Sequence, residues 1–63
     1  MNKVLIVEDE QDIRENIAEI FKLSKYKVFE AENGRKGLEA AAEIQPDIIV
    51  SDILMPEMDG WSV

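Results

Sequence analysis

The chain contains two short runs in which every residue is apolar. Residues 4–7 read VLIV and residues 48–50 read IIV, and an acidic residue follows each run within two positions. Short continuous runs rich in β-branched residues are typical of strands buried on both faces of a parallel sheet. They therefore predict two buried strands. Lys27–Ala31 mixes polar and apolar residues and predicts a third, less buried strand that suits an edge of the sheet.

Helical periodicity fills the first interval between these strands. In residues 12–24, apolar side chains recur at spacings of three and four with charged residues elsewhere, which predicts an amphipathic helix. Acidic residues at its start and lysines at its end suit the helix dipole. The apolar face is expected to consist of Ile13, Ile17, Ile20, Phe21 and, at its end, Ser24.

A second helix is predicted at Gly34–Ile44. Asn33 has the side chain of an N-cap, and the Gln45-Pro46 pair ends the helix because proline disfavours a helical residue before it. Its apolar positions are Leu38 and either Ala41 or Ala42. The alternation of strand and helix with short connections predicts parallel strands joined by right-handed crossovers, hence an α/β sheet.

Acidic residues follow two of the predicted strands. Glu8, Asp9 and Glu10 come after the first run, and Asp52 comes after the third strand. Parallel strands end at the same edge of a sheet, where ligands of such sheets bind. Two carboxylates about 4 Å apart repel by roughly 4 kcal/mol at an effective dielectric near 20, so a grouped set needs a cation. Mg²⁺ fits, because it prefers oxygen ligands and often takes only one or two carboxylates.

These acids allow more than one interpretation. A carboxylate beside Mg²⁺ can act as a nucleophile and form an acyl phosphate. Alternatively, residues 8–10 are solvated acids that partly cap the following helix, and Asp52 is a polar residue ending a strand. A hydrolytic enzyme is disfavoured, because the chain has no histidine and carboxylates would be the only obvious bases.

Composition limits the class of protein, its partners and its location in the cell. The chain has 63 residues, of which 46% are hydrophobic and 33% charged, which indicates one small globular domain. A net charge of -7 argues against direct contact with nucleic acid or an anionic membrane surface, and no apolar stretch is long enough for a membrane span or signal peptide. The absence of cysteine is compatible with the cytoplasm, where we expect the protein.

Two segments resemble the receiver domains of two-component response regulators. They are residues 4–10, VLIVEDE, and residues 52–60, DILMPEMDG. The resemblance covers residues 1–63 but only about half of the family fold, which is a doubly wound, flavodoxin-like sheet with strand order 2-1-3-4-5. It therefore implies an α/β fold that is the N-terminal half of a receiver domain, with strand order 2-1-3.

The resemblance also implies roles for individual residues. Asp52 would accept a phosphoryl group from a histidine kinase or a small phosphodonor, in a signalling domain that is not an enzyme. Glu8, Asp9 and Asp52 would bind Mg²⁺, with Asp9 the most direct ligand, and Leu54 would lend its backbone carbonyl. The remaining motif residues are expected to shape the loop or to pack, and they are Met55, Pro56, Met58, Asp59, Gly60 and Trp61.

The missing half of the family fold changes the expectation for this sequence. The hydroxyl residue and the lysine that contact the phosphoryl group in the family follow its fourth and fifth strands, so phosphorylation is expected to be impaired. The strand of Ile48, Ile49 and Val50 would have an open edge, which predicts a homodimer, symmetric or swapped. A self-associating fragment without signalling activity is the alternative. Lys25 also departs from the family, in which a glycine commonly ends the first helix.

Overall fold

The structure is a computed structural model that describes residues 2–51. In this part of the chain, strands and helices alternate as the sequence predicts: β1 is Lys3–Val7, α1 is Gln11–Leu23, β2 is Lys27–Ala31, α2 is Gly34–Ile44 and β3 is Ile48–Ser51. The predicted phosphoacceptor, the predicted carbonyl ligand and the predicted loop and packing residues lie outside the described residues. These are Asp52, Leu54, Met55, Pro56, Met58, Asp59, Gly60 and Trp61.

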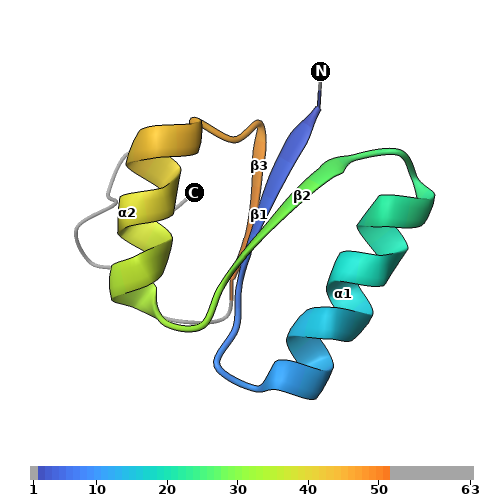
Figure 1. Cartoon of the computed structure of the whole chain (residues 1–63), viewed down its shortest axis with the longest axis horizontal. Helices are drawn as coiled ribbons and strands as arrows, with labels where there is room; N and C mark the ends of the chain where they lie inside the picture. Colours follow the sequence, from blue (N-terminus) through green and yellow to red (C-terminus); the bar gives the residue numbers. More distant parts are fainter. Residues whose placement is uncertain (1, 52–63) are drawn as a thin grey trace.

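The described strands form one parallel sheet with the order β2-β1-β3 (Figure 1). β1 pairs with β2 from Lys3 opposite Lys27 to Val7 opposite Ala31, and it pairs with β3 as far as Ser51, the partner of Val7. The predicted order 2-1-3 and the edge position of β2 are therefore confirmed.

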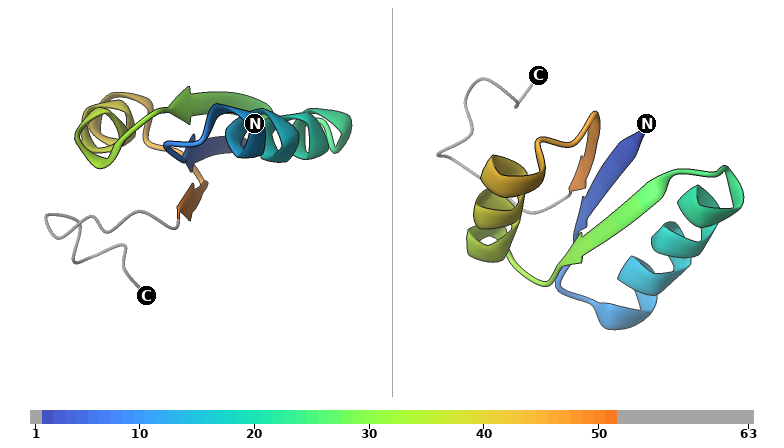
Figure 2. Two further views of the ribbon diagram at one scale, coloured as in Figure 1. Left: turned by 90° about the horizontal axis from the view of Figure 1, so that it is seen from below. Right: turned by 45° about the horizontal axis from the view of Figure 1, so that its top comes forward.

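The core of the molecule is built on β1. Val4, Leu5, Ile6 and Val7 are all 0% exposed. Because successive side chains of a strand point to opposite faces, Val4 and Ile6 pack with α1 whereas Leu5 and Val7 pack with α2. Figures 1 and 2 show the two helices on opposite sides of the described strands, which confirms the doubly wound arrangement.

α1 packs on the sheet through a narrower face than the sequence predicts. Ala18 is buried at the centre of the contact, with Ile17 and Phe21 beside it. The prediction was wrong for Ile13 and Ile20, which are 47% and 61% exposed. At 3.6 residues per turn they lie roughly 140° and 160° around the helix from Ala18, so they point away from the sheet once the small alanine faces it. The helix also ends at Leu23, with Ser24 as its exposed C-cap.

α2 begins and ends as predicted. The Asn33 side chain accepts a hydrogen bond from the backbone N–H of Lys36 at 2.8 Å, which is the expected N-cap. Of the two candidate alanines, Ala41 is buried and Ala42 is exposed. Gln45, in the left-handed conformation with φ 55°, closes the helix. Neither described helix combines the length and the hydropathy that crossing a membrane requires.

α1 ends in a Schellman motif around Lys25. The N–H of Tyr26 donates to the carbonyl of Phe21, and the N–H of Lys25 donates to the carbonyl of Lys22, both at 3.0 Å. The ring of Tyr26 also meets that of Phe21 edge to face, with centroids 5.1 Å apart, the apolar contact that often accompanies this motif. Lys25 itself has φ 68°, the left-handed conformation in which glycine is usual.

The start of β3 is fastened to the start of β1 by polar contacts. The backbone N–H of Lys3 donates to the Asp47 carboxylate at 2.8 Å, and the N–H of Asp47 donates to the carbonyl of Lys3 at 2.9 Å. The Lys3 ammonium also donates to the carbonyl of Ile44 at 2.9 Å, near the end of α2. These contacts close the connection between α2 and β3.

Because Lys25 has a positive φ, glycine substitutions at two lysines should change the free energy of unfolding in opposite directions. Lys25→Gly should raise the free energy of unfolding by about 0.5–1 kcal/mol, because glycine adopts a positive φ without steric cost. Lys22→Gly, inside the last turn of the same helix, should lower it by up to about 1 kcal/mol through lost helix propensity. Urea denaturation followed by circular dichroism measures both, and a loss of stability in Lys25→Gly would contradict the explanation.

Candidate functional site

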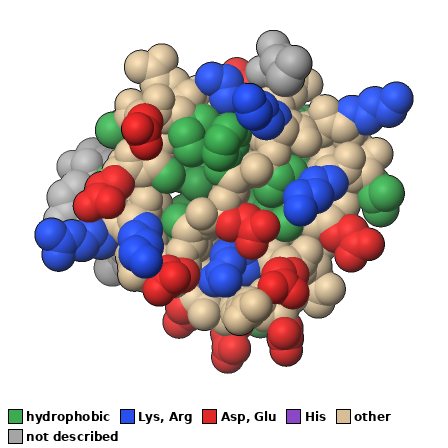
Figure 3. Space-filling model, viewed as in Figure 1, with side chains coloured by type: hydrophobic (Ala, Val, Ile, Leu, Met, Phe, Trp, Pro, Cys, Tyr) green, Lys and Arg blue, Asp and Glu red, His purple; other side chains and the backbone are tan. Residues whose placement is uncertain are grey.

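The carboxyl ends of the described strands meet at one edge of the sheet. Val7, the last residue of β1, is the register partner of both Ala31 in β2 and Ser51 in β3. This is the lower edge in Figure 1, where β1 runs into α1, and Asp and Glu side chains gather along it in Figure 3. The acidic segment of residues 8–10 therefore leaves the sheet beside the end of β3.

Glu8 is held firmly at this edge. Its side chain is buried, with 5% of the residue exposed, and its carboxylate accepts a hydrogen bond from the backbone N–H of Glu10 at 3.1 Å. Its own N–H donates to the carbonyl of Ala31 at 3.1 Å, which extends the pairing of β1 and β2 by one bond. A buried carboxylate is costly unless it is hydrogen-bonded, so these contacts fix where Glu8 lies.

Asp9 and Glu10 are exposed. Glu10 is the N-cap of α1, with an extended backbone and no hydrogen bond from its side chain to the helix. The capping interpretation of the acidic segment is thus correct only in that Glu8 accepts from the N–H of the N-cap residue. The carboxylate of Asp9 lies in the part of the segment that is open to solvent and to ligands.

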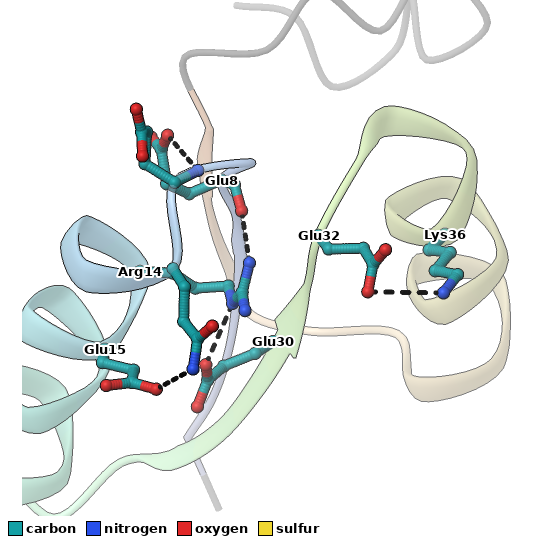
Figure 4. Close-up of polar contacts among 8 residues, drawn as sticks. Glu8, Arg14, Glu15, Glu30, Glu32 and Lys36 are labelled. Atoms are coloured by element: carbon teal, nitrogen blue, oxygen red, sulfur yellow. Dashed lines mark hydrogen bonds and ion pairs between the residues drawn. The ribbon is translucent and has the colours of Figure 1, made fainter.

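Arg14 connects the acidic segment to the edge strand of the sheet. Its Nη1 donates to the backbone carbonyl of Glu8 at 2.8 Å, and its Nε lies 3.2 Å from a carboxylate oxygen of Glu30 in β2. Figure 4 shows the Arg14 side chain between Glu8 and Glu30. Only 16% of this side chain is exposed, so most of it is packed against the edge of the sheet.

Sequence reasoning missed Arg14, which the helical pattern counts among the charged residues outside the apolar face. A signal is nonetheless present in the sequence. Arg14 precedes Ile17, Ala18 and Phe21 by three, four and seven residues, the spacing of one helix face. An arginine on the face that packs against the sheet, one turn after an acidic segment, is placed to meet oxygen atoms at the edge of the sheet.

The chemistry of these donors suits a hard divalent cation. Carboxylate and carbonyl oxygens are the ligands that Mg²⁺ prefers, and Asp9 presents an exposed carboxylate beside the buried one of Glu8. Within residues 2–51, no three acidic side chains come close enough to hold a metal ion by themselves. A metal site here thus depends on further donors. The predicted ones, Asp52 and the carbonyl of Leu54, lie outside the described residues.

Comparison with known proteins identifies this arrangement. The family model of the response regulator receiver domain matches residues 4–63. The chain belongs to this family. The parallel sheet of order β2-β1-β3, with a helix on either side, is accordingly the corresponding part of the flavodoxin-like receiver fold. Receiver domains are signalling modules of two-component response regulators, so the family also assigns the chain to this kind of signalling.

Several curated proteins contain a similar receiver sequence. The regulatory protein AtoC of Escherichia coli is 43% identical over 60 residues, which cover 95% of this chain and 13% of AtoC. The chemotaxis protein CheY of Listeria monocytogenes is 48% identical over 61 residues, or 95% of this chain and 51% of that protein. The sporulation initiation phosphotransferase F of Bacillus subtilis is 38% identical over 61 residues, with coverages of 97% and 49%.

The chain spans only part of these relatives, from 13% of the length of AtoC to 51% of that of CheY. Its similarity therefore concerns the receiver segment that they share. The names of these proteins differ in what they regulate, from chemotaxis to sporulation. The receiver family is thus established for this chain, whereas its individual partners are a matter of proposal.

Proposed function

We propose that this receiver chain accepts a phosphoryl group on Asp52 from a histidine kinase, with Mg²⁺ bound beside it. The observation that carries the proposal is the register of β1 and β3. Val7 and Ser51 are partners in the sheet, and they directly precede Glu8 and Asp52 in the sequence. This register supports an arrangement in which Asp52 and the acidic segment of residues 8–10 share one edge.

In the proposed reaction, a carboxylate oxygen of Asp52 attacks the phosphorus of the donor. The new bond joins that oxygen to phosphorus, and the bond from phosphorus to the kinase histidine nitrogen breaks, which leaves an acyl phosphate on Asp52 and a neutral histidine. Bound Mg²⁺ would supply neutralisation of the charge on the transferred oxygens. Phosphoryl transfer is also what the name of the B. subtilis relative describes for that protein.

The proposed metal ligands are Glu8, Asp9, Asp52 and the backbone carbonyl of Leu54. The exposure of Asp9 supports its role as the most direct carboxylate ligand. The burial of Glu8, and its bond to the N–H of Glu10, support a steadier and less direct contribution. In this proposal the chain is a signalling module of the cytoplasm and not an enzyme with turnover of its own.

Phosphorylation of Asp52 is testable with a small phosphodonor. The chain treated with acetyl phosphate and Mg²⁺ should gain one phosphoryl group in intact-mass spectra, and Asp52→Asn should abolish the gain because an amide is no nucleophile for phosphorus. Asp12→Asn is the matched control, since Asp12 is an exposed aspartate in the first turn of α1. Equal modification of Asp52→Asn would contradict the assignment.

The metal assignment has its own test. Mg²⁺ titration followed by amide chemical shifts should move residues 8–10, and EDTA should prevent modification by acetyl phosphate. Asp9→Asn should weaken Mg²⁺ binding by at least about tenfold, because even outer partners of metal ligands contribute roughly 10- to 100-fold. Asp12→Asn should leave the affinity within about twofold, as expected of a surface charge in high dielectric. An unchanged affinity in Asp9→Asn would contradict its role.

A homodimer is a second proposal, and it concerns assembly. β3 pairs with β1 on one side, and no described strand lies on its other side. Its residues Ile48, Ile49 and Val50 are only half-buried. An apolar strand with an open edge can pair with another chain, and a second copy offers the same edge by two-fold symmetry.

Sedimentation velocity across micromolar concentrations tests this assembly. The proposal expects a reversible dimer whose share grows with concentration, because burial of the apolar edge drives association by mass action. Circular dichroism on the same samples verifies that the chain is folded. A folded monomer over the whole range would contradict the homodimer while leaving the signalling proposal intact.

A further inference from the structure

Among the described residues, Arg14 makes contacts that join three parts of the fold. It belongs to α1, its Nη1 holds the carbonyl of Glu8 after β1, and its Nε pairs with Glu30 in β2. A guanidinium is a rigid planar fork, so one donor cannot move without the other. The pairing with Glu30 therefore fixes the direction from which Arg14 approaches the acidic segment.

The contact with the Glu8 carbonyl bears directly on Asp9. The carbonyl of Glu8 and the nitrogen and Cα of Asp9 belong to one planar peptide unit. The N–H of Glu8 is bonded to Ala31 at the other end of the same residue. With Glu8 fastened at its N–H by β2 and at its carbonyl by Arg14, the position of the Asp9 Cα is restricted. The bond from the Glu10 N–H to the Glu8 carboxylate restrains the peptide unit on the other side of Asp9, so that the direction of its side chain is restricted as well.

We propose that Arg14 is a positioning residue that orients the Asp9 carboxylate for Mg²⁺ by holding the Glu8 carbonyl. This inference rests on the proposed function of the acidic segment as a metal site. Arg14 touches neither the metal nor the phosphoryl group in this scheme. It acts through the backbone of Glu8, and Glu30 acts in turn by orienting Arg14.

Electrostatics alone predicts the opposite effect of Arg14 on metal binding. A positive charge beside an acidic site repels a divalent cation, so its removal would strengthen Mg²⁺ binding if charge were its main influence. Loss of orientation would weaken binding instead. A residue that merely stabilises the fold would change the free energy of unfolding and leave the affinity of the folded molecules unchanged. The sign of the change in Mg²⁺ affinity separates these roles.

The test uses two substitutions of Arg14 and one matched control in the 63-residue chain. Arg14→Met keeps an unbranched stem of similar reach and removes both donors and the charge. Arg14→Lys keeps the charge but has no planar fork with which to hold Glu8 and Glu30 together. Arg35→Met is the control, because Arg35 in α2 is 89% exposed and makes only a loose 3.9 Å pair with Glu39.

Mg²⁺ titration followed by amide chemical shifts gives the first readout. Arg14→Met and Arg14→Lys should both raise the dissociation constant by roughly tenfold, the lower end of the range for outer partners of metal ligands. Arg35→Met should lower it slightly or leave it unchanged. Unchanged or tighter binding in Arg14→Met, or full retention of affinity in Arg14→Lys, would overturn the inference. The proposed metal site would survive that result.

Amide hydrogen exchange without metal gives the second readout. The N–H of Glu10, which is bonded to the Glu8 carboxylate, should exchange faster in Arg14→Met by a larger factor than the amides of β1 do. A uniform increase across β1 and Glu10 would indicate a merely structural role and overturn the inference. If the unsubstituted chain bound no Mg²⁺, the proposed function would fail, and this exchange experiment would still decide whether Arg14 orders the acidic segment.

Discussion

The complete burial of β1 is the constraint on which the described fold depends. Its residues Val4 to Val7 have no exposed surface and supply side chains to both faces of the sheet. Burial of four such side chains contributes about 6–12 kcal/mol before entropy is subtracted, comparable to the whole net stability of a small domain. Because both faces of β1 are apolar, however, this burial does not select one register over its neighbours. A contact of a particular side chain at the start of β1 does distinguish them, because the N–H of Lys3 donates to the Asp47 carboxylate.

The same register determines where the acidic segment of residues 8–10 lies. One residue separates the most buried part of the chain, ending at Val7, from the exposed carboxylate of Asp9. The first residue of the acidic segment, Glu8, makes the last hydrogen bond to β2, and α1 starts immediately after the segment. A fully buried core strand thus carries the short acidic segment that is proposed to bind the metal ion. The sheet determines where the acidic segment lies, whereas the orientation of its side chains depends on contacts outside the sheet.

The sequence predicts the parts of this structure that depend on local patterns. Continuous apolar runs identified β1 and β3, but the prediction of full burial was right only for β1, because Ile48, Ile49 and Val50 are half-buried in a strand at the edge of the described sheet. A capping side chain identified the start of α2 at Asn33. The face of α1 was less predictable, because four large apolar residues compete for it and the sheet accepts the small Ala18 at the closest approach. The contact of Arg14 with Glu8 and Glu30 was missed for a related reason. This contact joins three parts of the fold, and the periodicity of one helix does not show which residues of other elements lie opposite it.

In the proposed metal site, the carboxylates repel one another while no cation is bound. Direct pairing of an arginine with Asp9 would relieve this repulsion but would also compete with Mg²⁺ for the same oxygens. The described bonds of Arg14 avoid this conflict, because they go to a backbone carbonyl and to Glu30, outside residues 8–10. The Arg14 guanidinium therefore steadies the segment through its backbone and leaves the exposed carboxylate of Asp9 available. If residues 8–10 bind Mg²⁺ as proposed, this arrangement orders the segment without occupying the Asp9 carboxylate.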